Sequence, residues 1–225
     1  MLTVDPISII AQGFMKPLEQ SETGQLYRQP CVVTTISGEE ISCTFESITI
    51  ANKFNNRAII KLEDGTKVKY KPNELKSIKV KNKESRNKMK TSDTTAVNAV
   101  WNRTDFPEYN YVVFESVFVM GNKDLQFMQL LNPDANARIK VYSLGNSSFN
   151  SGSIGGVGVE LKGSDTYLFI KDGMRFFEVK RKDYKKHFYE LYGDCPSLIS
   201  TLRNTSYKWN EIAGDVYIFN QVCEK

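Results

Sequence analysis

The sequence has a single histidine, His187, and no apolar run approaching the roughly 20 residues that a membrane-spanning helix requires. It contains no HExxH, GxSxG or Walker-type motif, and no pair of carboxylates stands out for acid–base chemistry. Its four cysteines form no CxxC pair and have no clustered histidines beside them. These absences predict no zinc site, no cofactor and no membrane span, and they leave no residue to assign to catalysis.

The composition is that of a folded protein. Of the 225 residues, 40% are hydrophobic, 12% aromatic and 25% charged, which argues against disorder throughout the chain. A chain of this length suits one large domain or two small ones. The changing pattern predicts four segments: an N-terminal arm or residual signal segment over 1–26, a small β-barrel-like module over 27–81, a basic linker or loop over 82–100, and an antiparallel sheet with a C-terminal helical cap over 101–225.

The clearest pattern lies in residues 30–81. Two β-branched runs around Ser37-Gly38-Glu39 predict a first hairpin, and Asp64-Gly65 between alternating residues predicts a second. A short turn at 72–75 and a final strand, KSIKV, follow. Five short strands with this spacing predict a small barrel, similar in architecture to Sm-like and Src-homology-type barrels.

Alternating runs return between residues 109 and 180 and predict an antiparallel sheet of five or six strands. These runs cover 109–120, 125–131, 137–144, 156–162, 166–171 and 174–180. About three helices follow, because apolar residues then recur at helical spacing. Their predicted buried faces are Tyr184, Phe188 and Leu191, then Cys195, Leu198, Ile199 and Leu202, then Ile212, Val216, Phe219 and Cys223. Strands followed by helices predict the α+β class.

The stretch ISIIAQG, residues 7–13, is similar to the tail of a signal peptide. However, Asp5 and Pro6 interrupt the apolar run, and no basic region precedes it. Three interpretations stay open: a clipped signal peptide, an apolar arm that packs on the fold, and a tail that binds a partner. If this segment is native and uncleaved, we expect a cytoplasmic protein.

Cys195 follows Asp194 at the predicted start of a helix, eight residues after His187. A thiol there could be a nucleophile with histidine as its base. We discount this dyad for three reasons. Asp194 is predicted to cap the helix and offset its field, Cys195 shares the apolar face, and a glycine break separates it from His187.

The cysteines instead favour two disulfides, with unbonded core thiols as the alternative. Cys195 and Cys223 fall on the buried faces of neighbouring helices, and a bond between them would stabilise the fold by roughly 3–4 kcal/mol. Cys31 and Cys43 have the same parity on paired strands, which places them near one another. Two disulfides would indicate a location outside the cytoplasm.

Residues 67–90 contain ten lysines and arginines but only Glu74 and Glu84 as acids. Such a run could bind an anionic partner, nucleic acid included. It could equally be the solvent face of a strand followed by a basic linker. The candidate binding residues are Lys76, Lys79, Lys81, Lys83, Arg86, Lys88 and Lys90.

Three stretches of the C-terminal half carry a resemblance: FMQLLNPDANARIKVYSL, then TYLFIKDGMRFFEVKRKDYKKHFYELYGDCPSLIS, then KWNEIAGDVYIFNQVC. Together with SGEEISCTF and YKPNELKSIKV nearer the N-terminus, this pattern resembles uncharacterised exported proteins of Bacteroidota. The matching frame is Asp194-Cys195-Pro196 followed by Asn220-x-x-Cys223. The resemblance implies a periplasmic or secreted location and paired cysteines, but no reaction.

We therefore expect a non-enzymatic extracytoplasmic protein of the bacterial envelope that binds or supports an unknown protein or envelope component. The alternative is a nucleic-acid-binding protein that uses the predicted barrel and the basic run. Within the predicted linker, Asp93-Thr94-Thr95 matches the short O-glycosylation acceptor pattern of Bacteroidota, which makes Thr94 a candidate glycosylation site.

Overall fold

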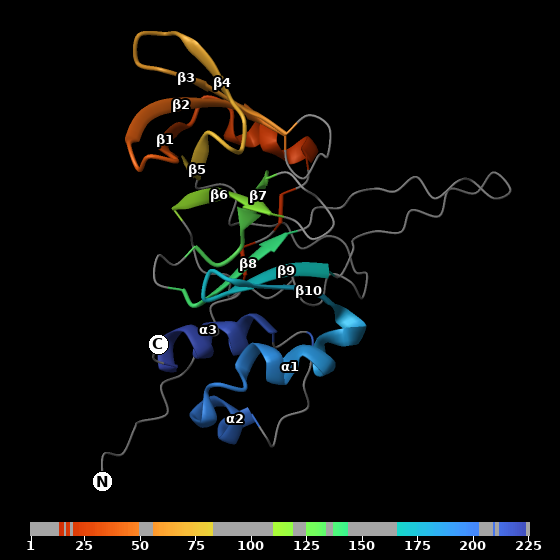
Figure 1. Cartoon of the computed structure of the whole chain (residues 1–225). Coiled ribbons are helices and arrows are strands. Elements are labelled where there is room, and N and C mark those ends of the chain that lie inside the picture. Colours follow the sequence, from red (N-terminus) through yellow and green to blue (C-terminus); the bar gives the residue numbers. More distant parts are fainter. Residues whose placement is uncertain are drawn as a thin grey trace, which may run out of the picture.

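The computed structural model describes residues 14–15, 17–18, 20–49, 56–82, 110–118, 125–133, 137–143, 166–202, 209 and 212–223. Ten strands form a single sheet in the order β10-β9-β8-β7-β6-β5-β1-β2-β3-β4, and every neighbouring pair is antiparallel. Figure 1 shows the N-terminal strands at one end of the molecule and the helices packed beneath β8–β10 at the other.

The N-terminal part contains the predicted five strands. A short 3-10 helix, η1, precedes them, and their bounds are η1 (Gln20–Leu26), β1 (Pro30–Thr35), β2 (Glu40–Ile48), β3 (Ala58–Lys61), β4 (Lys67–Tyr70) and β5 (Leu75–Lys81). Both predicted tight turns are present. Gly38 and Gly65 occupy them with φ of 91° and 87°, a conformation that side chains with a Cβ rarely adopt.

The predicted five-stranded barrel does not close. Closure requires β4 to pair with the free edge of β5, but that edge pairs with β6 instead, so the sheet stays open. In the register, Val80 of β5 lies opposite Val112, and Ile78 lies opposite Phe114. These four side chains are fully buried. The chain therefore buries the apolar side chains of β5 by continuing the sheet into β6 rather than by closing a barrel.

The C-terminal part matches the predicted α+β order. Its strands are β6 (Tyr111–Phe118), β7 (Leu125–Leu130), β8 (Ile139–Ser143), β9 (Thr166–Lys171) and β10 (Arg175–Lys180). A 3-10 turn, η4 (Arg181–Asp183), leads into α1 (Tyr184–Tyr192), α2 (Pro196–Leu202) and α3 (Ile212–Val222). The strand predicted at 156–162 lies outside the described residues. No described helix is long and apolar enough to cross a membrane.

The buried side chains form two main cores on one side of the sheet. The N-terminal core lies inside the curl of β1–β5 and also takes in Val112, Phe114 and Phe127 from β6 and β7. The helical core lies between β8–β10 and the helices, and includes the aromatic residues Tyr167, Phe169, Tyr184, Phe188, Tyr192, Trp209 and Phe219. Because β6 and β7 contribute side chains to the N-terminal core, the predicted C-terminal segment, 101–225, takes part in both cores. The predicted linker is mostly outside the described residues, and the division into domains stays a prediction.

The segment before η1 connects the two cores. Phe14 is buried in the helical core with its ring edge-on to Tyr167, at 5.6 Å between centroids. Leu18 is buried in the N-terminal core, and its backbone N–H donates to the side-chain oxygen of Gln129 at 2.6 Å. Met15 donates from its backbone to Leu131 at 2.7 Å. The described residues 14, 15, 17 and 18 therefore pack on the fold. The stretch ISIIAQG, residues 7–13, lies outside the described residues, so its three interpretations stay predictions.

Candidate functional site

Both predicted disulfides are present, one in each core. Cys31 and Cys43 face each other directly across β1 and β2, with their Cα atoms 5.1 Å apart. Cys195 and Cys223 join the start of α2 to the end of α3, with their Cα atoms 5.6 Å apart. All four residues are buried. Each core thus carries a covalent cross-link of its own.

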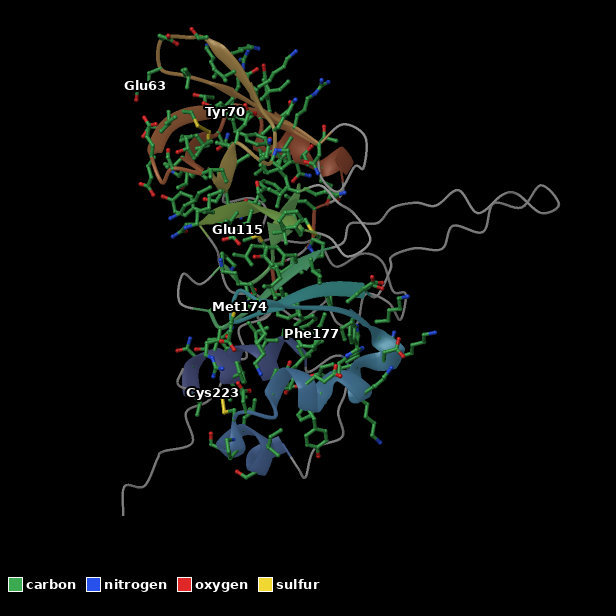
Figure 2. The ribbon with its side chains drawn as sticks, viewed as in Figure 1. Glu63, Tyr70, Glu115, Met174, Phe177 and Cys223 are labelled. Atoms are coloured by element: carbon green, nitrogen blue, oxygen red, sulfur yellow. A yellow bond between two sulfur atoms is a disulfide. The ribbon has the colours of Figure 1, made fainter. Side chains whose placement is uncertain are left out.

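Cys195, the residue before α2, is not available as a nucleophile. Its sulfur is bonded to Cys223, whose position at the end of α3 is labelled in Figure 2. His187 lies instead against Glu190, with Nδ1 2.6 Å from the carboxylate. The arrangement around Cys195 is a cross-link between helices, and the Cys–His dyad that we discounted is not formed.

Asp194 was predicted to cap α2, and this prediction is wrong. The helix begins with Pro196, a residue that suits the first helical position because its missing N–H has no intrahelical partner there. The Asp194 carboxylate turns toward two cations. Its Oδ1 lies 2.6 Å from Lys171 Nζ, and its Oδ2 lies 2.7 Å from an Arg138 guanidinium nitrogen. Because α2 begins one residue later than predicted, Asp194 does not occupy its cap position, and its carboxylate pairs with the two cations instead.

Lys171 is almost fully buried, with 1% of its surface exposed. A buried ammonium is costly unless its donors are satisfied. Here the Nζ donates to Asp194 and also to the backbone oxygen of Leu191 at 2.7 Å. The lysine therefore fastens the end of β9 to the C-terminal turn of α1.

Arg138 extends the same network from the residue before β8. It forms a bidentate pair with Asp172, at 2.9 Å and 3.1 Å, and it donates to the backbone oxygen of Cys223 at 3.3 Å. The ring of Phe219 lies next to both cations, 4.8 Å from the Arg138 Cζ and 5.0 Å from the Lys171 Nζ. Cations at this distance from an aromatic ring are attracted by its quadrupole.

Asn220 completes this arrangement, which we call the joint: Arg138, Lys171, Asp172, Asp194, Phe219, Asn220 and the Cys195–Cys223 disulfide. Its amide pairs with both backbone groups of Ile139. The Ile139 N–H donates to Oδ1 at 2.8 Å, and Nδ2 donates to the Ile139 oxygen at 3.0 Å. α3 is thereby held to the first residue of β8. The Asp-Cys-Pro and Asn-x-x-Cys motifs meet at the joint, which gives their spacing a structural reason.

The joint lowers the pKa values of its two carboxyls. For Asp172 the largest cause is the hydrogen bond from Arg138. For Asp194, burial alone would raise the pKa, but the hydrogen bonds from Lys171 and Arg138 outweigh it and lower the pKa. The pKa of Arg138 is raised, chiefly by its bond to Asp172. All three groups are therefore held in their charged forms at neutral pH.

A second polar cluster lies deeper in the helical core. The Tyr184 hydroxyl donates a short hydrogen bond to the buried carboxylate of Asp215, and the hydroxyls of Tyr184 and Tyr192 are 3.4 Å apart. Burial is the main cause that raises the pKa of both tyrosines. They remain neutral donors, and the cluster ties α1 to α3.

A third cluster lies on the other side of the sheet, around Glu115 of β6, which Figure 2 labels near the middle of the molecule. Its carboxylate accepts from Lys140 Nζ at 2.9 Å and 3.1 Å, and from the Tyr142 hydroxyl at 2.6 Å. Burial, followed by the charge on Glu115, raises the pKa of Tyr142. Apolar side chains surround this cluster: Val117, Met128, Leu130, Leu168 and Ile170.

The structure describes three of the seven basic candidates. Lys76, Lys79 and Lys81 are exposed side chains of β5, and the Lys79 ammonium lies 4.4 Å from the centre of the Tyr111 ring. The other four, Lys83, Arg86, Lys88 and Lys90, lie outside the described residues, as does Thr94. Among the described residues, no group of three or more His, Cys, Asp or Glu is placed to hold a metal ion.

The sequence reasoning missed Arg138 and Lys171, although one signal was present. Lys171 has the same parity in its strand as Tyr167 and Phe169, which places it on the face that packs against the helices. A lysine on such a face needs an anionic partner. No protein-family model, curated protein or solved structure matches this chain. The resemblance to exported proteins of Bacteroidota therefore stays a prediction.

Proposed function

We propose that this chain is a non-enzymatic extracytoplasmic protein of the bacterial envelope, which binds a partner or supports an envelope structure. The observation that carries the proposal is the pair of disulfides, one in each core. Disulfides persist in oxidising compartments such as the periplasm and are rare in the cytosol. The proposed link to exported Bacteroidota proteins supports the same location.

The chemistry around Cys195 supports a structural role for the joint. Asp194 accepts from two cations, and Lys171 donates both to it and to a backbone oxygen. Polar side chains that make their hydrogen bonds within the protein hold its helices and strands together. The joint thus favours a scaffold whose surface, rather than its interior, meets a partner.

The oxidation state of the cysteines tests this proposal. The protein would be isolated from its native cells in the presence of an alkylating agent, and its intact mass measured without reduction. We expect no alkylation before reduction and four alkylated cysteines after reduction and denaturation, which serves as the control. Four freely alkylated thiols in the native sample would overturn the extracytoplasmic proposal.

A second candidate function is nucleic-acid binding, because Lys76, Lys79 and Lys81 project from β5 into solvent. Such a protein would bind generic DNA or RNA with an affinity that falls steeply as salt rises. Changing Lys79, Lys81 and Lys83 to glutamate should then abolish the binding. A mobility shift that is insensitive to these substitutions would eliminate this candidate.

A further inference from the structure

Five lysines point outward from the strands that surround the N-terminal core: Lys61 of β3, Lys67 and Lys69 of β4, and Lys79 and Lys81 of β5. We call them the lysine face. All five are exposed, while the residues that alternate with them, such as Ile60 and Val80, are buried. This alternation is what a strand with one solvated face requires.

The register shows that these lysines share one surface. Lys79 lies opposite Val32 of β1, and Val32 lies opposite Ser42 of β2. Two residues further along β2, Thr44 lies opposite Lys61, which in turn lies opposite Lys67. Directly paired residues of neighbouring strands project from the same face of a sheet. The face therefore runs continuously from β5 to β4.

Its positive charge is poorly balanced. Lys67 is paired with Glu46 at 2.6 Å, but the other four lysines make no ion pair among the described residues. Lys61 and Lys67 stand directly opposite each other, and like charges in that position destabilise a sheet. A bound polyanion would remove this repulsion, so the face is complementary to negative charge.

Short hydroxylated residues lie between the two groups of lysines, together with Val32 of β1 and the exposed Glu40 of β2, which lies opposite Thr34. Thr34 of β1 and Ser42 and Thr44 of β2 occupy this part of the face. Ser77 of β5 also belongs to it and donates to the Thr34 hydroxyl at 3.2 Å. Small hydroxyl groups both donate and accept hydrogen bonds, as the hydroxyls of sugars do.

We propose that the lysine face binds an acidic polysaccharide, whose carboxylates pair with the lysines and whose hydroxyls meet the serines and threonines. This inference rests on the proposed extracytoplasmic function, which would place the face among envelope glycans. The face is less suited to nucleic acid. Its five lysines bind as point charges rather than as the bidentate fork that arginine offers to phosphate, and the exposed Arg28 beside Lys67 already lies over the ring of Tyr27. Stacking platforms are also needed for single strands, and the Tyr111 ring already contacts the Lys79 ammonium.

The test measures binding of fluorescent alginate oligosaccharides, which are linear polyuronates, to the full chain at low ionic strength. We expect binding that weakens with salt, and a loss of affinity of at least about tenfold in the variant Lys79→Glu/Lys81→Glu, because attraction becomes repulsion at two points. The matched control is Lys185→Glu/Lys186→Glu, which makes the same charge change at exposed positions of α1. The control should bind as the parent chain does, and thermal unfolding would verify that both variants are folded.

Three outcomes would overturn the inference: no alginate binding by the parent chain, equal loss in the control variant, or tighter binding of a single-stranded oligonucleotide at the same salt concentration. The last outcome would assign the face to nucleic acid. Cysteine oxidation is measured on the same native preparation. Oxidised cysteines without alginate binding would contradict the ligand alone, whereas free thiols would contradict the extracytoplasmic proposal.

Discussion

The two cores are cross-linked in different ways. In the N-terminal core, the disulfide joins residues that the β1–β2 ladder already places opposite each other. In the helical core, the disulfide joins two helices, and around it the contacts are made by side chains: the ion pairs of Asp194, the amide of Asn220 and the ring of Phe219. A sheet satisfies its backbone groups through its own ladder. Helices against a sheet have no shared ladder, so their position depends on side chains.

Ion pairs of similar geometry are expected to contribute differently to stability, depending on how far their charges are buried. An ion pair at the surface, such as Lys180–Glu178, contributes little, because water already stabilises both charges. In the joint the cations Lys171 and Arg138 are largely buried, so losing a carboxylate partner would leave a positive charge out of water. Four sets of variants would sharpen or break this contrast.

The largest effect is expected from Lys171→Met. The substitution removes two charge-assisted hydrogen bonds, to Asp194 and to the Leu191 oxygen, each worth about 1.5–3 kcal/mol, and we expect the free energy of unfolding to fall by about 3–5 kcal/mol. The matched control is Lys180→Met, which breaks the Lys180–Glu178 pair, whose side chains are 52% and 42% exposed. It should cost less than about 1 kcal/mol. Urea titrations would measure both, and similar losses would refute the contrast.

Removal of the disulfides comes next. Replacing Cys195 and Cys223 with alanine should lower the free energy of unfolding by about 3–4 kcal/mol, because a long loop is released in the unfolded chain. Replacing Cys31 and Cys43 should cost about 2–3 kcal/mol, since that loop spans only 12 residues. Denaturant unfolding of the two double variants makes the comparison. A larger loss from the β1–β2 pair would show that the hairpin depends on its cross-link.

Acid should weaken the helical core before the N-terminal core. The pKa values of Asp172 and Asp194 are lower in the folded chain than in an unfolded one, so their contribution to stability is complete above about pH 5. It is lost as the pH falls below about 4, through the folded pKa values. Fluorescence of Trp209, made the sole tryptophan by Trp101→Phe, would follow this core.

The control for the acid experiment is Arg138→Leu, which removes a cation that both carboxylates share. This variant should be less stable at neutral pH and should lose less further stability on acidification. If it shows the same acid dependence as the parent chain, the joint is not the source of that dependence.

The smallest expected effect is a gain. Lys61→Glu places a carboxylate opposite Lys67 in the β3–β4 pair, and we expect a small rise in the melting temperature because repulsion becomes attraction. Lys69→Glu is the matched control, since its partner is the uncharged Ile59. Thermal unfolding at low salt measures both. A gain of equal size in the control would point to the net charge of the chain rather than to the pair.

Local patterns predicted most of the elements. Alternation located β1–β10, and the helical spacing of Tyr184, Phe188 and Leu191 identified the buried face of α1. The same spacing placed Cys195 and Cys223 on the buried faces of two neighbouring predicted helices, which is why the disulfide between them could be predicted, although each lies one residue outside its helix in the structure. Such patterns work because they depend only on the period of each element.

The errors arose where distant segments compete for the same edge or atom. The five N-terminal strands have the spacing of a barrel, yet β6 takes the edge of β5 that closure would need. Asp194 lies at the predicted cap position of α2, yet its carboxylate oxygens form ion pairs with Lys171 and Arg138. Both competitors are remote in sequence, so no local period reveals them.

The sequence by itself determined where this chain turns, which side of each strand and helix is apolar, and which cysteines could meet, because these follow from nearest-neighbour geometry and periodicity. Only the tertiary structure decided that the sheet stays open, that Asp194 serves the joint rather than a helix end, and that five lysines from three strands form one face. Each of those outcomes depends on which remote partner gains most from burial or charge pairing, and that comparison exists only once the whole chain has folded.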